Sequence, residues 1–135
     1  MKKINLIVPR RLEERKERYK KMCYKVIRDY VESGSKETLW LGGYPEETLP
    51  PILKTVGALD LMDSQIKYLP DGLNIKGDWL DLRGSQIEEI PKNLKVKGEI
   101  WLNDTPLSRK YNAEELEIMI YDRGGKITNR GYVSI

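Results

Sequence analysis

Two aspartates, Asp60 and Asp81, are the residues of this sequence best placed to do chemistry. Each stands between two leucines of a repeated segment, and stacked copies of that segment would bring the two carboxylates side by side. Adjacent carboxylates can share a proton or hold a cation, and Asp63, Asp104 and Glu99 are expected near the same sheet edge. A carboxylate-based hydrolase is therefore one hypothesis, although acidic residues are common on solvated strands and no second catalytic group accompanies these.

Other familiar chemistries lack their residues. The sequence contains no histidine, which excludes Ser-His-Asp and Cys-His nucleophile activation and nearly every common zinc site. The single cysteine, Cys23, falls in an apolar helical stripe, which predicts packing rather than a reactive thiol. Neither a GxxxxGK[ST] loop nor a GxGxxG turn is present to cradle a nucleotide. We expect a protein that is not an enzyme and that holds no cofactor or metal ion.

An internal repeat must position the two aspartates. Each copy opens with an apolar residue and a proline, continues to a glycine, and then shows an apolar-x-apolar pair followed five positions later by Ile or Leu. A degraded earlier copy is visible at Leu39 and Leu41. A fixed period of roughly 20 residues predicts a solenoid. The three clear copies are LPPILKTVGALDLMDSQI from Leu49, LPDGLNIKGDWLDLRGSQI from Leu69 and IPKNLKVKGEIWLNDTPL from Ile90.

The repeat also assigns directions to side chains. Side chains alternate faces along a strand, so the middle residue of each apolar pair points outward when the leucines enter the core. All three tryptophans then lie on one outer face. The residues predicted there are Trp40, Asp60, Asp81 and Trp101 in one column, with Trp79, Ala58 and Glu99 beside it.

Two alternatives account for large aromatics on an outer face. In the first, an amphipathic helix of the chain itself covers them as ordinary buried residues. In the second, Trp40, Trp79 and Trp101 are anchors for a protein partner, with Asp60, Asp81 and Glu99 adding polar specificity. A flat ladder of this kind could also pair two copies of the protein.

A basic segment precedes the repeat. Residues 1–36 carry 12 basic and 5 acidic residues, a net charge of +7, whereas residues 37–135 carry a net charge of −4. Here we expect a short strand followed by an amphipathic helix that ends near Ser33 and caps the solenoid; whether residues 4–8 pair with residues 132–135 stays open. The stripe predicted to pack comprises Leu12, Tyr19, Met22, Cys23, Val26, Ile27, Tyr30 and Val31.

The opposite side of this helix offers a second candidate function. Its Lys and Arg side chains could contact phosphates, although the interspersed Glu13, Glu14 and Glu17 dilute the positive field. The residues that would bind nucleic acid are Arg11, Arg15, Lys16, Lys20 and Lys21.

The C-terminal segment is expected to form a second cap. Asn112 followed by Glu115 predicts a helix start, and Leu116 and Ile120 would then face the core. Beyond Gly124-Gly125, residues 126–135 predict a terminal strand or a hairpin that turns near residues 129–131.

The whole chain is expected to form one α+β domain, with residues 1–36 as the N-terminal strand and basic helix, 37–110 as the solenoid and 111–135 as the C-terminal cap. The apolar runs are too short for a membrane span or a secretory signal, so we expect a cytoplasmic protein without membrane contact.

The LPxxL...LxL pattern, from Leu39 to about Leu107, resembles the short leucine-rich repeats of bacterial and bacteriophage proteins. One departure is that Ser64, Ser85 and Thr105 stand where such repeats usually carry asparagine. The resemblance implies a non-enzymatic recognition surface. It also implies a phage or mobile-element accessory protein that inhibits or redirects a host protein, such as a defence nuclease.

Overall fold

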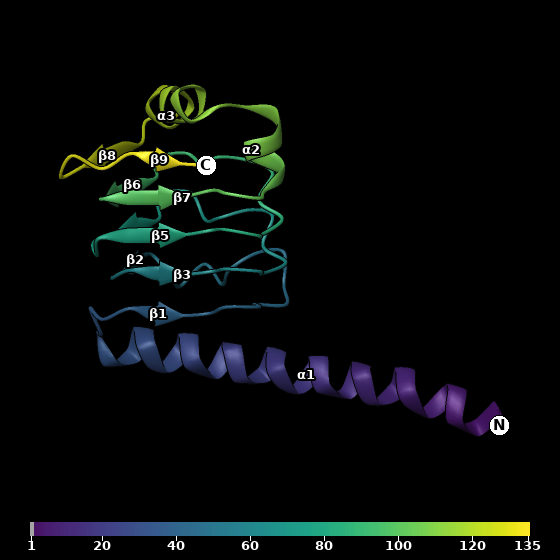
Figure 1. Cartoon of the computed structure of the whole chain (residues 1–135). Coiled ribbons are helices and arrows are strands. Elements are labelled where there is room, and N and C mark those ends of the chain that lie inside the picture. Colours follow the sequence, from purple (N-terminus) through teal and green to yellow (C-terminus); the bar gives the residue numbers. More distant parts are fainter. Residues whose placement is uncertain (1) are drawn as a thin grey trace.

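The computed structural model describes the backbone of residues 2–135 and the side chains of residues 11–135. The described chain has an α+β architecture with three helices and two parallel β-sheets (Figure 1). The helices are α1 (Lys2–Ser33), α2 (Pro106–Lys110) and α3 (Ala113–Asp122). The strands are β1 (Leu39–Trp40), β2 (Thr55–Val56), β3 (Leu59–Asp60), β4 (Asn74–Ile75), β5 (Trp79–Asp81), β6 (Lys95–Lys97), β7 (Glu99–Trp101), β8 (Lys126–Thr128) and β9 (Val133–Ser134).

Each of the three clear repeat copies places one short strand in each sheet, whereas the degraded first copy contributes β1 alone. The five-stranded sheet has the order β1-β3-β5-β7-β9 and the four-stranded sheet the order β2-β4-β6-β8. Because neighbouring strands are parallel, equivalent residues of successive copies lie side by side. Leu59 is opposite Leu80, for example, and Leu80 is opposite Ile100. The predicted α+β class is confirmed.

The core lies between the two sheets. Leu59, Leu80 and Ile100 of the five-stranded sheet, and Val56 and Ile75 of the four-stranded sheet, are each at most 1% exposed. They belong to one continuous apolar cluster. Burying such a side chain contributes roughly 1.5–3 kcal/mol, so strands of two or three residues are held by stacking rather than by their own propensity.

A glycine stands where the chain passes from the four-stranded to the five-stranded sheet. A Cβ atom on Gly77 would lie 2.2 Å from the backbone nitrogen of Ala58, and one on Gly98 would lie 2.1 Å from the carbonyl oxygen of Asp78. The backbones of successive copies therefore touch at these turns, and any side chain would separate them. This explains the glycine of the repeat.

Helix α1 runs along the β1 end of the five-stranded sheet (Figure 1). Cys23 and Ile27 are buried there, at 4% and 1% exposure. The Tyr30 hydroxyl donates a hydrogen bond to the carbonyl of Glu37 at 2.7 Å and accepts one from the Gly57 N–H at 2.9 Å. The helix ends at Ser33, as predicted, and it covers the exposed edge strand of the sheet.

The buried stripe of α1 is narrower than the sequence predicted. The helix packs against a single edge strand, and its N-terminal part projects past the sheets (Figure 1), so only one line of side chains reaches the core. The predicted members that remain exposed are Leu12 (50%), Tyr19 (36%), Met22 (61%), Val26 (43%) and Val31 (37%).

The strand expected at the N-terminus is wrong, because α1 begins at Lys2. Pairing of residues 4–8 with residues 132–135 is ruled out by their positions. Strand β9 pairs with β7 at the far end of the five-stranded sheet, whereas α1 lies at the β1 end (Figure 1).

The C-terminal helix agrees with the sequence, but the hairpin does not. Asn112 and Glu115 form a capping box at the start of α3, and Leu116 and Ile120 are fully buried. Strands β8 and β9 belong to different sheets, pairing with β6 and β7 respectively. Residues 126–135 are therefore one further turn of the repeat, in which α3 replaces the proline-containing opening.

Tyr44 provides a prediction about alkaline stability. The side chain is fully buried, its hydroxyl donates to the carbonyl of Thr48 at 2.8 Å, and burial raises the pKa of Tyr44 well above its usual value. Since the folded-state pKa exceeds the unfolded one, the stabilisation is complete below about pH 10 and is lost as the pH rises further. Urea unfolding at pH 7 and at about pH 11 should show this loss, and Tyr44→Phe should show a smaller one. An equal loss in both proteins would contradict the prediction.

Candidate functional site

Six residues proposed from the sequence as a binding surface lie together on the outer face of the five-stranded sheet. The register places Trp40 opposite Asp60, Asp60 opposite Asp81, and Asp81 opposite Trp101. Trp79 lies opposite Glu99 in the neighbouring column. The period of the repeat was therefore sufficient to predict this clustering.

The three tryptophans form a continuous aromatic row across this face. The ring centroids of Trp40 and Trp79 are 5.8 Å apart and tilted by 56°, and those of Trp79 and Trp101 are 5.5 Å apart and stacked within 7°. Trp40 and Trp79 contact each other although β3 separates their strands. Ala58 precedes Leu59 as Trp79 precedes Leu80, so the β3–β5 register places Ala58 beside Trp79. Its small side chain leaves room for this contact.

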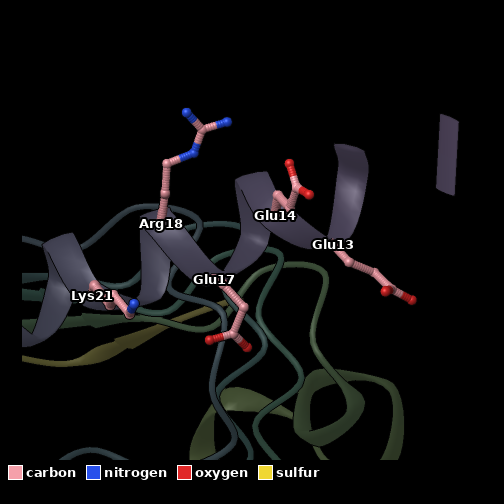
Figure 2. A pocket seen from close by; sticks show the side chains of 5 residues that line it. All are labelled: Glu13, Glu14, Glu17, Arg18 and Lys21. Atoms are coloured by element: carbon pink, nitrogen blue, oxygen red, sulfur yellow. The ribbon is translucent and has the colours of Figure 1, made fainter. Parts of the chain in front are cut away.

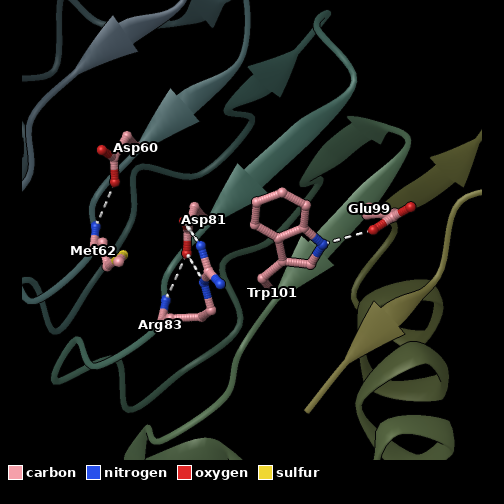
Figure 3. Close-up of polar contacts among 6 residues, drawn as sticks. All are labelled: Asp60, Met62, Asp81, Arg83, Glu99 and Trp101. Atoms are coloured by element: carbon pink, nitrogen blue, oxygen red, sulfur yellow. Dashed lines mark hydrogen bonds and ion pairs between the residues drawn. The ribbon is translucent and has the colours of Figure 1, made fainter.

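Arg83 contacts both Asp81 and Trp101, the tryptophan at one end of the aromatic row. Its Nε and Nη2 atoms donate to the Asp81 carboxylate at 3.0 and 2.8 Å, and its guanidinium lies 4.8 Å from the Trp101 ring centroid (Figure 3). The hydrogen bonds to Asp81 raise the pKa of Arg83. Asp81 is thus a buried carboxylate already neutralised by an arginine.

Sequence reasoning did not select Arg83. The signal that could have found it is the two-residue period of the strand, because Arg83 follows Asp81 by two positions and so faces outward on the same side. Glu99 completes the polar surround at the other side of Trp101, accepting a hydrogen bond from the indole Nε1 at 2.7 Å (Figure 3).

Asp60 differs from Asp81 in what accompanies it. Both carboxylates accept a hydrogen bond from the backbone N–H two residues later, Met62 at 2.9 Å and Arg83 at 3.1 Å (Figure 3). Asp60 has a methionine where Asp81 has an arginine. Among the residues whose side chains are described, no Lys or Arg forms an ion pair with Asp60, which remains partly exposed.

The chain's own helices leave the aromatic row open. Trp40 is 67% exposed, and Trp79 and Trp101 are partly exposed. Helix α1 lies at the β1 end of the sheet and α3 at the β9 end, so neither crosses the face between them (Figure 1). Of the two alternatives, cover by a helix of the same chain is therefore not what the described structure shows.

The five residues predicted to contact nucleic acid do not share one side of α1. Arg15 and Lys16 border a hollow between the helix and the turn after β1, and Lys20 pairs with Glu46 at 2.8 Å. Arg11 is exposed one turn before Arg15. Lys21 belongs instead to a mixed-charge surface with Arg18, Glu13, Glu14 and Glu17, whose side chains diverge from one another (Figure 2).

Comparison of the chain with known protein families, curated proteins and solved structures finds no match. None of the described helices combines the length and the apolar character that a membrane span requires. The described Cys, Asp and Glu residues also form no group of three that could hold a metal ion.

Proposed function

We propose that the protein is a non-enzymatic protein-binding module, a small leucine-rich-repeat-like solenoid whose aromatic row contacts a partner. Three observations support the solenoid. Each of the three clear repeat copies contributes one strand to each of two parallel sheets, the copies touch at their glycines, and α1 and α3 lie at opposite ends of the stack.

The exposure of Trp40 is the observation that supports a binding role most strongly. A tryptophan that is 67% exposed loses most of the free energy that burial would supply, yet here it extends a row of two further tryptophans. Tryptophan and arginine are the residues most often found at the energetic centre of protein interfaces. Asp60, Glu99 and Arg83 would form the polar surround of such a centre.

The resemblance to short bacterial and bacteriophage leucine-rich repeats extends the proposal to a class of partner. By this analogy the protein acts in the cytoplasm as a phage or mobile-element accessory protein that inhibits or redirects a host protein such as a defence nuclease. Such a partner requires a recognition surface and no catalytic group on this chain.

Trp40→Ala should weaken partner binding by at least about thirtyfold, the effect of losing one energetic anchor. The stability of the protein should change little, because most of this ring is already solvated. The partner is first captured on the immobilised full chain, then purified and titrated against each variant by calorimetry. Ile118→Ala is the matched control, since this residue is 52% exposed on α3, away from the aromatic row, and should leave the affinity unchanged.

Other outcomes assign the interaction differently. Undiminished binding by Trp40→Ala and Trp101→Ala would overturn the proposal. If binding also weakened steeply with salt and required Arg11 and Arg15, the function would move to the basic helix and a nucleic acid. Self-association that is lost in Trp40→Ala, measured by analytical ultracentrifugation, would identify the partner as a second copy.

A further inference from the structure

We propose that Trp40 and Asp60 bind an arginine side chain of the protein partner. This inference rests on the proposed function and specifies the chemistry of the residue that the surface recognises. It follows from comparing two places on this face where an aspartate is in register with a tryptophan of an adjacent strand. In one the arginine is supplied by the chain, and in the other it is absent.

The filled place is Arg83 with Asp81 and Trp101. Two nitrogens of the guanidinium donate to the two carboxylate oxygens, at 3.0 and 2.8 Å, while the cation lies over the indole ring at 4.8 Å (Figure 3). Both contacts use the planar, forked shape of arginine. The protein therefore already shows that an aspartate and a tryptophan in adjacent strands of this face hold an arginine.

The unfilled place lies one repeat earlier. Asp60 is in register with Trp40 on the preceding strand, whereas Asp81 is in register with Trp101 on the following strand. The residue that follows Asp60 by two positions is Met62 instead of an arginine. The backbone of Met62 donates to one oxygen of Asp60, and its side chain carries no charge (Figure 3). Within residues 11–135, the other oxygen makes no ion pair with a basic side chain.

There is also room beside this second oxygen. Gly42 follows Trp40 by two residues, as Met62 follows Asp60. A Cβ atom added at Gly42 would lie 3.6 Å from Asp60 Oδ2, an ordinary contact distance. The absent side chain leaves the carboxylate open on the side of Trp40, whose ring is 67% exposed. A partner arginine would make the same two kinds of contact as Arg83, stacking on the Trp40 ring and donating two hydrogen bonds to the Asp60 carboxylate, with the tryptophan on the other side of the aspartate. A lysine ammonium is a compact point charge without a planar fork, so it could not both stack on the Trp40 ring and donate in parallel to the two Asp60 oxygens as a guanidinium does.

The test uses the full-length, ¹⁵N-labelled chain and a blocked tripeptide, acetyl-Gly-Arg-Gly-amide. We expect saturable shifts of the Trp40 indole N–H signal, assigned by its absence from Trp40→Phe. The same peptide with citrulline, which is neutral and nearly isosteric with arginine, should cause much smaller shifts. Equal shifts with the two peptides, or no saturable shift with arginine, would overturn the inference.

Two variants test the site from opposite directions. Asp60→Asn removes the carboxylate charge, and Met62→Arg supplies the missing guanidinium from within the chain. Each should weaken binding of the arginine peptide at least about tenfold, as expected for losing a charge-assisted pair. Asp63→Asn is the matched control. It makes the same charge change three residues after Asp60, in the turn that follows β3. Asparagine tolerates the φ of 55° at this position, so the variant should keep the affinity for the arginine peptide. Equal weakening by all three variants would indicate general electrostatics and would overturn the site.

The same variants separate this inference from the proposed function. If Trp101→Ala abolishes binding of the protein partner while Met62→Arg leaves it intact, the aromatic row binds a partner without this arginine, and only the further inference fails. If none of these variants affects the partner but the arginine peptide still binds at Trp40, the proposed function fails while the pocket chemistry stands.

Discussion

Replacing Gly77 with alanine should lower the free energy of unfolding by about 3 kcal/mol, at the upper end of the usual cost of overpacking. The added Cβ would lie 2.2 Å from the nitrogen of Ala58 and 2.7 Å from the carbonyl carbon of Gly57. Both are backbone atoms, so no rotamer change can relieve the contact. The two copies would have to separate, weakening the parallel pairing of β3 with β5 and of β2 with β4.

Gly42→Ala is the matched control for this substitution. Its Cβ would have its nearest contacts at 3.6 Å and 3.8 Å, which is ordinary van der Waals distance. Urea unfolding followed by circular dichroism should show a much lower midpoint for Gly77→Ala and a midpoint close to that of the parent protein for Gly42→Ala. Similar midpoints for the two variants would mean that the copies do not approach each other as closely as described.

The outer face could be predicted because strand geometry links sequence spacing to direction. Once Leu59/Leu61 and Leu80/Leu82 are taken as core, Asp60 and Asp81 must point outward and lie in register. The glycine between the two strands of each copy follows the same period. The period does not reveal which contacts the large side chains make across neighbouring strands. The stacking of Trp79 on Trp101, and the fork of Arg83 on Asp81, depend on rotamers that no spacing determines.

The last repeat copy was missed for a different reason. Its glycine and apolar residue, Gly131 and Val133, follow the repeat pattern, but Asn129 and Arg130 are inserted before them. Both insertions adopt a φ of 56°, which lets the chain make the extra turn and return to the register of β7. Because α3 replaces the proline-containing opening, the spacing suggested a local hairpin.

The ends of the stack explain why α1 departs from its sequence pattern. An interior copy has a neighbour on both sides, whereas β1 has only β3 on one side and α1 on the other. A single edge strand accepts one line of side chains from a helix, which is why Ile27 is 1% exposed and its neighbour Val26 is 43% exposed. The sequence shows a broad apolar stripe, but the width of the surface that receives it is a property of the tertiary structure.

These adjacent residues make the second large prediction. Ile27→Ala should lower the free energy of unfolding by about 2–4 kcal/mol, because it removes buried methyl groups and leaves a cavity where the helix meets the core. Val26→Ala should change it by less than about 0.5 kcal/mol, since that residue is 43% exposed and outside the buried cluster, and alanine favours a helix. Chemical denaturation of both variants under one condition provides the measurement.

The contrast between the two variants tests the capping role of α1 itself. If Ile27 anchors the helix, Ile27→Ala should also increase hydrogen exchange of the backbone amides of Leu39 and Leu41, which donate to Ala58 and Asp60 across the β1–β3 edge. Amides deeper in the stack, such as that of Leu82, should keep their protection relative to global unfolding. Equal destabilisation by Val26→Ala and Ile27→Ala would instead mean that α1 contacts the sheet through a broader surface, with Val26 buried and the stripe as wide as its sequence predicts.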